Sequence, residues 1–333
     1  MPRQPRLDIA GLLHHVMIRG IERRKIFRSN ADRNDLIDRL SSLLPATGTI
    51  CYAWSFMPNH AHFLVRSGPS GIAHFMRKLL TGYAVSFNHR HSRTGQLFQN
   101  RYKSIICQED AYFLELVRYI HLNPLRARVV STLDELDRFA FSGHSALMGI
   151  KGRPWQDASF VLRLYGADIK NARRAYHSSV EKGILQGARE DLSGGGFVRS
   201  LGGWSEIKNL KHRVKGDQRI LGDSEFVTRI LQEAKEHFDR RQLLKEKGHT
   251  LESVADTVSA LYQIDKGSLL SKGRRSPLVE ARDLFCYVAV RGLGAQASAL
   301  AKLTGMSPSS ISYAVRRGKD IAGQKHVFEE ILK

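Results

Sequence analysis

Two histidines separated by a single residue, His60 and His62, have the spacing that most directly suggests chemistry in this chain. They follow the turn signal Pro58-Asn59 and begin the apolar run HAHFLVR. Alternate side chains of a β-strand point to the same face, so the two imidazoles could share one divalent metal ion. The chain contains 14 histidines, and a pair with this spacing also occurs by chance on a strand. The histidines alone therefore leave the metal site open.

A tyrosine and an asparagine one helical turn apart form a second candidate pair. Tyr119 and Asn123 stand at positions i and i+4 of the segment ELVRYIHLNP, on one face of a helix. A tyrosine hydroxyl, with a pKa of about 10, is a weak nucleophile unless a metal polarises the phosphodiester that it attacks. Asn123 could offer its carbonyl oxygen to that metal. The alternative is an amphipathic helix in which Tyr119 packs and Asn123 caps the helix before Pro124.

The elements that must position these residues follow from periodicity and turn signals. Helical spacing of apolar residues predicts three helices, which begin near Asn30, Ile72 and Glu109, and the last of these is expected to stop at Pro124. Apolar, β-prone runs predict four strands, at residues 12–19, 49–57, 60–66 and 103–107. The order βαββαβα is typical of an α+β, ferredoxin-like sandwich with a split βαβ motif.

Composition narrows the class of partner. Lys and Arg number 52 against 32 Asp and Glu, a net charge of +20, and both halves of the chain are positive. Such a chain is expected to meet a polyanion, of which nucleic acid is the usual one. We expect no membrane partner, because no apolar run approaches the length of a spanning helix and the first residues lack the apolar core of a signal peptide. Three scattered cysteines predict neither a disulfide framework nor a zinc site, as in a reduced cytoplasmic protein.

Longer motifs in the first half resemble a known family. The chain closely resembles the REP-associated tyrosine transposases of the HUH superfamily in the stretches MPNHAHFLV, GQLFQNRYKS and RYIHLNPLRARVV, which occur in the same order and spacing. The opening HHVMIRGIERRKIF is similar to the first strand and loop of that family. The resemblance covers roughly residues 8–150 and implies a ferredoxin-like HUH nuclease fold.

The resemblance also implies an activity. It points to a metal-dependent endonuclease and strand transferase that cleaves and rejoins single-stranded DNA, at hairpin or palindromic repeats, through a covalent 5′-phosphotyrosine. By position it assigns the nucleophile to Tyr119, and the binding of Mg²⁺ or Mn²⁺ to His60, His62 and Asn123.

Further residues are expected to take part or to compete. Three other tyrosines are weaker candidates for the nucleophile: Tyr83, Tyr102 and Tyr112. Two basic residues before and at the start of the last predicted strand, Arg101 and Lys103, are expected to contact DNA phosphates, although solvated surface charges would have the same pattern.

The end of the chain resembles a second family. Residues 249–318 are similar to the C-terminal DNA-binding domain of the bacterial replication initiator DnaA, including LESVADTVSALYQIDKGSLLSKGRRSPLVEARDLFCYVAV and the helix-turn-helix after it. By position, a minor-groove loop corresponds to Lys272, Arg274 and Arg275, and a recognition helix to Ser309, Ser310, Ser312, Tyr313 and Arg316. Met306-Ser307-Pro308 replaces the acidic and histidine-bearing signature of that family, so we expect duplex binding but not binding to the initiator's own DNA box. The alternative is a helical bundle that uses the motif only for packing.

We therefore expect an HUH tyrosine transposase domain in residues 1–150, a helical connector in 151–220 and an all-α, helix-turn-helix DNA-binding domain in 221–333. The expected partners are single-stranded, hairpin and duplex DNA, and the protein is expected to be a monomer or homodimer in the bacterial cytoplasm, associated with the nucleoid. A non-catalytic DNA-binding regulator is the alternative function, and a relaxase or rolling-circle initiator would share the chemistry.

Overall fold

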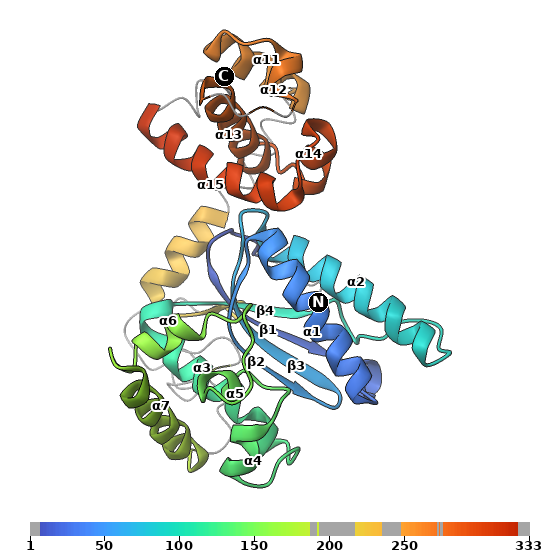
Figure 1. The fold of residues 1–333 in the computed structure, drawn as a ribbon, viewed down its shortest axis with the longest axis vertical. Coiled ribbons are helices and arrows are strands. Elements are labelled where there is room, and N and C mark those ends of the chain that lie inside the picture. The colour runs from blue at the N-terminus through green and yellow to red at the C-terminus, as the bar shows by residue number, and fades with distance from the viewer. Residues whose placement is uncertain are drawn as a thin grey trace, which may run out of the picture.

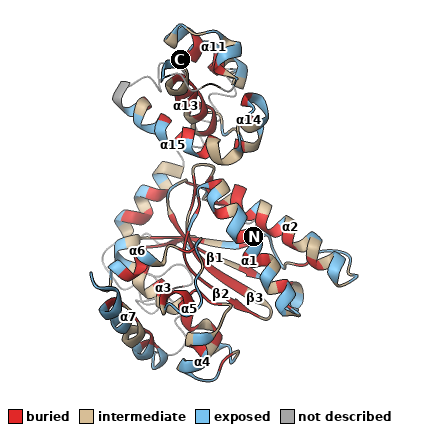
Figure 2. Cartoon of the chain, in the orientation of Figure 1, coloured by how far each residue is buried: buried red, intermediate tan, exposed pale blue. Residues whose placement is uncertain are grey.

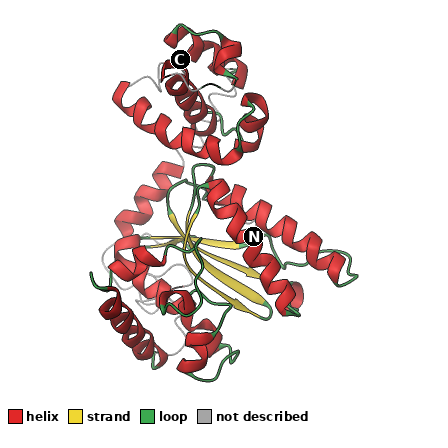
Figure 3. Cartoon of the chain, viewed as in Figure 1, coloured by secondary structure: helices red, strands yellow, loops and turns green. Residues whose placement is uncertain are grey.

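The computed structural model describes residues 7–186, 192, 217–234, 248–271, 273 and 276–325. It shows a mixed α+β arrangement in which a five-stranded sheet is followed by a mostly helical C-terminal region (Figures 1 and 3). Among the described residues, no helix combines the length and the apolar character needed to cross a membrane.

The sheet has the strand order β2-β3-β1-β4-β5, with β1 (Leu13–Arg19) at its centre. Strands β2 (Ile50–Met57) and β3 (His60–Arg66) form an antiparallel hairpin, and β4 (Lys103–Cys107) pairs antiparallel with the other edge of β1. These four strands occur within one residue of the predicted positions. A 3₁₀ turn, Ile21–Arg23, follows β1.

Helices cover both faces of this sheet. Helices α1 (Asn30–Thr47) and α2 (Gly71–Arg90) pack on one face, over a core that includes Val16, Phe56 and Phe63. Helix α3 (Glu109–Arg126) packs on the other face, over a second core. The strands between the two layers are buried along most of their length (Figure 2). Because strand side chains alternate, each strand contributes to both cores.

The sequence predicts that helix α3 stops at Pro124. In the structure the helix continues to Arg126. Proline lacks the backbone N–H that would bond the carbonyl of Ile120 one turn earlier. In the structure the side-chain amide of Asn123 donates to that carbonyl at 3.4 Å and to the carbonyl of Tyr119 at 3.1 Å. A neighbouring side chain therefore replaces the missing donor, and the helix passes through the proline.

The chain after α3 covers the outer edge of strand β2. The backbone of Phe141, Gly143 and Asp157 bonds to β2, and a buried hydrogen bond runs from Trp54 Nε1 to Gln156 Oε1 at 2.9 Å. Four helices lie in and after this stretch: α4 (Leu133–Arg138), α5 (His144–Leu147), α6 (Ala158–Arg163) and α7 (Ile169–Ile184). Helices α6 and α7 fall in the predicted connector and pack on the α3 side of the sheet.

A fifth strand, β5 (Ile220–Leu221), was absent from the sequence prediction. It pairs parallel with β4, and the helix that begins at residue 224 packs beside it through Phe226, Val227 and Ile230. The expected boundary between residues 220 and 221 falls inside this strand. Residues 221–234 therefore belong to the sheet and not to the C-terminal helices. A two-residue strand carries no detectable alternation, so periodicity had no means of finding it.

The C-terminal helices have their own core. Helices α11 (Leu251–Tyr262), α12 (Lys266–Leu269), α13 (Ser276–Arg291), α14 (Ala297–Thr304) and α15 (Pro308–Lys325) enclose a cluster centred on Leu284, Phe285 and Ile311. Gly305, with φ +66°, ends α14, and only two further residues precede α15. A left-handed glycine here lets the two helices turn sharply against each other.

We expect Gly48→Ala to destabilise the first domain. Gly48 ends α1 with φ +63°, and an added Cβ would lie 3.2 Å from Pro69 Cδ. The left-handed conformation costs a residue with a Cβ roughly 1–2 kcal/mol, so urea unfolding should show a loss of about that size. Gly152→Ala is the matched control, since a Cβ there meets nothing within 4 Å. Equal effects of the two substitutions would contradict the strain argument.

Candidate active site on the α3 face of the sheet

His60 and His62 lie on strand β3 and face helix α3, while Ala61 between them packs into the opposite core. Their rings are edge-on, with centroids 5.3 Å apart and planes at 75°. Strand alternation therefore brings the two imidazoles together on one face, as the spacing predicts.

One nitrogen of each imidazole is already engaged. His60 Nδ1 lies 2.6 Å from Asn59 Oδ1, so the ring donates to the amide oxygen. His62 Nδ1 lies 2.9 Å from Nε2 of His15, a fully buried residue of β1. A metal-binding histidine usually makes such a hydrogen bond with its second nitrogen, which leaves the first as the ligand atom. In both rings that remaining atom is Nε2.

Both imidazoles are held in the neutral form. Burial, with a smaller contribution from the charge of Arg19, lowers the pKa of His60 to about 4. Burial also lowers the pKa of His62 well below its ordinary value, and the neighbouring His15 and His60 act in the same direction. A neutral imidazole keeps the lone pair that metal coordination requires, so both rings are ready ligands at neutral pH.

The structure brings Tyr119 of α3 next to His62, one member of this pair. The Tyr119 ring is edge-on to His62, with centroids 6.0 Å apart, and edge-on to His15 at 5.8 Å. Its side chain is half-buried, between the sheet and solvent. The guanidinium of Arg126, two turns further along α3, lies 5.4 Å from the ring centroid. A guanidinium at this distance makes a cation–π contact with the ring and brings positive charge close to the phenol.

Asn123 stands one turn after Tyr119 on the same helix. Its amide nitrogen is bound to the helix backbone beside Pro124, and this fixes which side-chain atom remains to coordinate a metal. That atom is the carbonyl oxygen, a ligand that Mg²⁺ and Mn²⁺ accept. The capping role considered as the alternative for Asn123 is thus compatible with metal binding.

The competing tyrosines differ in their access to solvent. Tyr83 is fully buried on α2, its hydroxyl donates to the carbonyl of Ile26, and burial raises the pKa of its phenol. Tyr102 is 6% exposed and packs in the core under α1 and α2. Tyr112 is half-buried near the start of α3. None of the three has a ring contact with His60 or His62 among those found in the described residues.

The chemical types of the candidate ligand atoms indicate which metal ions they could bind. No group of three His, Cys, Asp or Glu side chains among the described residues could hold a metal ion. The candidate set is instead two imidazole nitrogens and one amide oxygen, which leaves other coordination positions for phosphate oxygens and water. Two imidazole nitrogens and an amide oxygen are donors that a divalent metal ion accepts, and imidazole suits Mn²⁺ better than the harder Mg²⁺.

Two basic side chains lie near the site, and a third lines a cavity along α2. Arg19 at the end of β1 pairs with His60 across the sheet, and Lys103 begins β4 opposite Met17. Both are exposed, and the charge of each lowers the pKa of His62. Arg101 is exposed and lines a cavity of about 880 Å³ that follows α2 toward the C-terminal helices. At the far end of this cavity Arg77 donates to Gln296 Oε1 at 3.0 Å.

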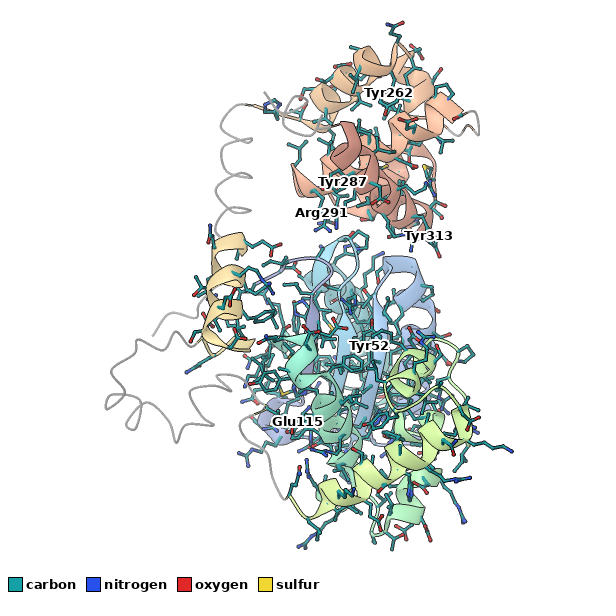
Figure 4. The ribbon with its side chains drawn as sticks, turned by 90° about the vertical axis from the view of Figure 1, so that its left-hand side faces the viewer. Tyr52, Glu115, Tyr262, Tyr287, Arg291 and Tyr313 are labelled. Carbon is teal, nitrogen blue, oxygen red and sulfur yellow. The ribbon has the colours of Figure 1, made fainter. Side chains whose placement is uncertain are left out.

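The residues that are expected to contact duplex DNA differ in their exposure, and three of them are not described by the structure. Lys272, Arg274 and Arg275 lie outside the described residues. Tyr313 is 53% exposed, with the Arg316 guanidinium 5.2 Å from its ring centroid, and the two lie on the surface of α15. Figure 4 shows Tyr313 and Arg291 on the side of the C-terminal helices that faces the sheet domain.

The three serines of α15 expected to contact DNA differ in exposure, since Ser309 and Ser310 are half-buried and Ser312 is buried. The hydroxyls of Ser309 and Ser310 pair with Ser307 at the start of the helix. Ser312 is only 7% exposed, donates to the carbonyl of Pro308, and lies against the Gly48 turn that ends α1. The side chain of Ser312 is thus buried between the two domains, where sequence similarity predicts a contact with a base.

Two residues of the site were not predicted from the sequence. His15 stands beside His14 in an apolar run, and this gives no sign that its ring would reach a histidine of another strand. Arg126 follows the proline that was expected to end the helix. The register of β1 and β3 brings His15 to the site, and the continuation of α3 past Pro124 brings Arg126 there. Both features depend on contacts between distant parts of the chain.

Residues 9–123 match the family model of IS200-like transposases. The matched transposase segment runs from just before β1 to Asn123 and thus includes every residue of the candidate site except Arg126. It supports a transposase-like, DNA-cleaving function for the sheet domain.

One solved structure, a REP-associated tyrosine transposase bound to a REP hairpin, is also similar. It shares 16% sequence identity, with a TM-score of 0.38, and the alignment covers 51% of this chain and 93% of that one. A search of curated proteins found no significant match.

Stability should fall as the pH is lowered from 6.5 toward 4. Burial lowers the pKa of His14 and of His15 to about 4, whereas histidines of the unfolded chain titrate near 6.5. Between these values the unfolded state binds more protons, so the free energy of unfolding decreases with decreasing pH. Each such imidazole should cost on the order of 2 kcal/mol at pH 5, measured by urea unfolding at pH 7 and pH 5. His14→Gln should reduce the difference, and equal stability at both values would contradict the buried neutral rings.

Proposed function

We propose that the sheet domain is an HUH nuclease of ferredoxin-like fold that cleaves and rejoins single-stranded DNA through a covalent 5′-phosphotyrosine on Tyr119. The observation that carries the proposal is the contact between the Tyr119 ring and His62, one of a histidine pair with both Nε2 atoms available. The IS200-like transposase match supports the reaction class.

The residues have separate roles in this reaction. His60, His62 and Asn123 would hold Mn²⁺ or Mg²⁺, which when bound supplies positive charge that orients and polarises the scissile phosphate. The Tyr119 oxygen forms a bond to phosphorus, and the bond from phosphorus to the 3′ oxygen breaks. The phenolic proton is lost and the departing 3′ oxygen gains one, so the products are a 5′-phosphotyrosine and a free 3′-hydroxyl.

Rejoining is the reverse of the same step. A 3′-hydroxyl attacks the phosphotyrosine, Tyr119 leaves, and a phosphodiester forms without an outside source of energy. The chain has no phosphate-binding GxxxxGK[ST] motif, in agreement with a reaction that needs no nucleotide. Arg126 beside the Tyr119 ring would stabilise the phenolate as it attacks and leaves.

Basic residues outside the metal site would hold the DNA strand. Arg19 on β1 and Lys103 on β4 lie on the same side of the histidine strand, and Arg101 lines the cavity along α2. Phosphate contacts of this kind position DNA without reading its sequence. Selection of a hairpin or palindromic repeat would then depend on shape and on contacts elsewhere.

We propose duplex binding for the C-terminal helices. The sharp turn at Gly305 between α14 and α15 has helix-turn-helix proportions, and Tyr313 and Arg316 are exposed on the second helix. The basic loop at Lys272, Arg274 and Arg275 would supply phosphate contacts. Since Ser312 lies against the Gly48 turn, entry of α15 into a major groove would require the C-terminal helices to move away from α1.

The central experiment removes one hydroxyl. Tyr119→Phe should abolish both cleavage of a labelled hairpin oligonucleotide and the covalent adduct seen on denaturing gels, because phenylalanine has no nucleophile. The fold should persist, since the half-buried ring remains. Tyr112→Phe, on the same helix, is the matched control and should retain both. An adduct on the Tyr119→Phe protein would transfer the nucleophile to another tyrosine, and cleavage by His60→Ala in EDTA would remove the metal from the mechanism.

A second experiment separates the two domains. Each phosphate contact contributes roughly 0.9 to the slope of log affinity against log salt, so Arg274→Ala with Arg275→Ala should make the slope for duplex binding shallower by about 2. The adduct on a short hairpin should still form, because Tyr119 is unchanged. A double variant that binds duplex as the wild type does, yet no longer cleaves, would place the basic loop at the nuclease site instead.

A further inference from the structure

The histidine that bonds to His62 has no role in the reaction described so far. His15 lies in the central strand β1, is fully buried, and points toward α3. Along the β1–β3 ladder His62 pairs with Met17, so His15 is its diagonal neighbour on the same face. Its ring is stacked on that of His62, with centroids 5.2 Å apart and planes at 28°.

His15 also touches the nucleophile. The edge of the Tyr119 ring meets both His15 and His62, at 77° and 78° to their planes. The three rings therefore form one packed group, in which His15 is the member with no exposure to solvent. A shift of His15 would move the metal ligand and the nucleophile together.

The hydrogen bond restricts which nitrogen of His62 carries a proton. A neutral imidazole has one N–H and one lone pair. If His62 is to offer its Nε2 lone pair to a metal, its proton must be on Nδ1, and an acceptor must then face Nδ1. His15 Nε2, 2.9 Å away, faces His62 Nδ1 and accepts this proton when the proton of His15 is on its own Nδ1. Without it, the buried Nδ1–H would be unsatisfied and the other tautomer, which cannot coordinate through Nε2, would compete.

The neighbouring histidine shows that burial alone does not create this arrangement. His14 is equally buried but points to the opposite face of the sheet, where its Nδ1 lies 2.9 Å from Ser104 Oγ. Among the described residues, no hydrogen bond or ring contact joins His14 to the candidate site. The chain thus offers two adjacent buried histidines, of which one is placed to affect the site and the other is not.

We infer that His15 is a positioning residue, which holds His62 in the Nδ1–H tautomer and orientation needed for metal binding and supports Tyr119 beside it. This inference rests on the proposed function, because it assigns His62 to a metal. It adds to that function a residue that touches neither metal nor DNA.

Metal affinity of the DNA-free protein tests the inference without relying on catalysis. Mn²⁺ binding to the full chain can be followed by the electron paramagnetic resonance signal of free Mn²⁺. Loss of a hydrogen-bond partner behind a ligand typically weakens metal binding 10–100-fold, and we expect a loss of about that size for His15→Phe. His15→Gln, which restores an acceptor, should recover most of the affinity. His14→Phe, a buried substitution of the same kind, should bind Mn²⁺ as the wild type does.

A second measurement needs no variant of His15. The ¹⁵N chemical shifts of selectively labelled histidine distinguish the two neutral tautomers, and a His62→Gln protein assigns the His62 signals. In the metal-free wild type we expect the proton of His62 on Nδ1. A proton on Nε2 would overturn the inference, even if substitution of His15 prevented folding.

The outcomes separate this inference from the function on which it rests. Wild-type Mn²⁺ affinity in His15→Phe, which fills the same space, would show that His15 only packs the core and would overturn the inference alone. Equal losses in His14→Phe and His15→Phe would also overturn it, because they would indicate general disturbance of β1. Absence of Mn²⁺ binding in the wild type would overturn the metal site of the proposed function and this inference together.

Discussion

The candidate site depends on the packing of helix α3 against the face of the sheet that carries the histidines. Leu116 and Ile120 of α3 are buried in that face, and Tyr119 between them is left at the border with solvent. The same packing places the Tyr119 ring against His62. Neither the helix nor the β1–β3 pair contains a site alone, because the ligands and the nucleophile come from different layers. Any change that rotates α3 by a fraction of a turn would separate them.

A series of buried, hydrogen-bonded side chains contacts α3 on its side away from the sheet histidines. His121, on the side of α3 away from the sheet histidines, bonds through Nδ1 to the hydroxyl of Tyr176 on α7 at 2.7 Å. That hydroxyl also bonds to His144, whose other nitrogen lies 2.7 Å from Asp137 Oδ1. Hydrogen bonds between buried groups are costly to break, so this series favours one orientation of the helix. Helices α4, α5 and α7, which follow α3 in the chain, thus contribute to the placement of Tyr119.

Sequence patterns predicted the strands and the shared face of His60 and His62 because alternation is local, and the resemblance led to Tyr119. Features that depend on distant partners were missed. Asn123 replaces the hydrogen-bond donor that Pro124 lacks, and this keeps α3 helical. Strand β5 is too short to show an alternating pattern. His15 reaches His62 only through the register of strands β1 and β3. The contact of Ser312 with the Gly48 turn likewise depends on two segments that are far apart in the chain.

The central claim is that Tyr119, packed against His62, is the residue that joins to DNA. The most direct measurement is mass spectrometry of peptides from the wild-type protein after incubation with a single-stranded hairpin oligonucleotide and Mn²⁺. The account predicts a nucleotide attached through a 5′ phosphate to the peptide that contains Tyr119, and its absence when EDTA replaces the metal. Attachment to a peptide that contains Tyr102, or cleavage of the oligonucleotide with no protein adduct at all, would contradict it.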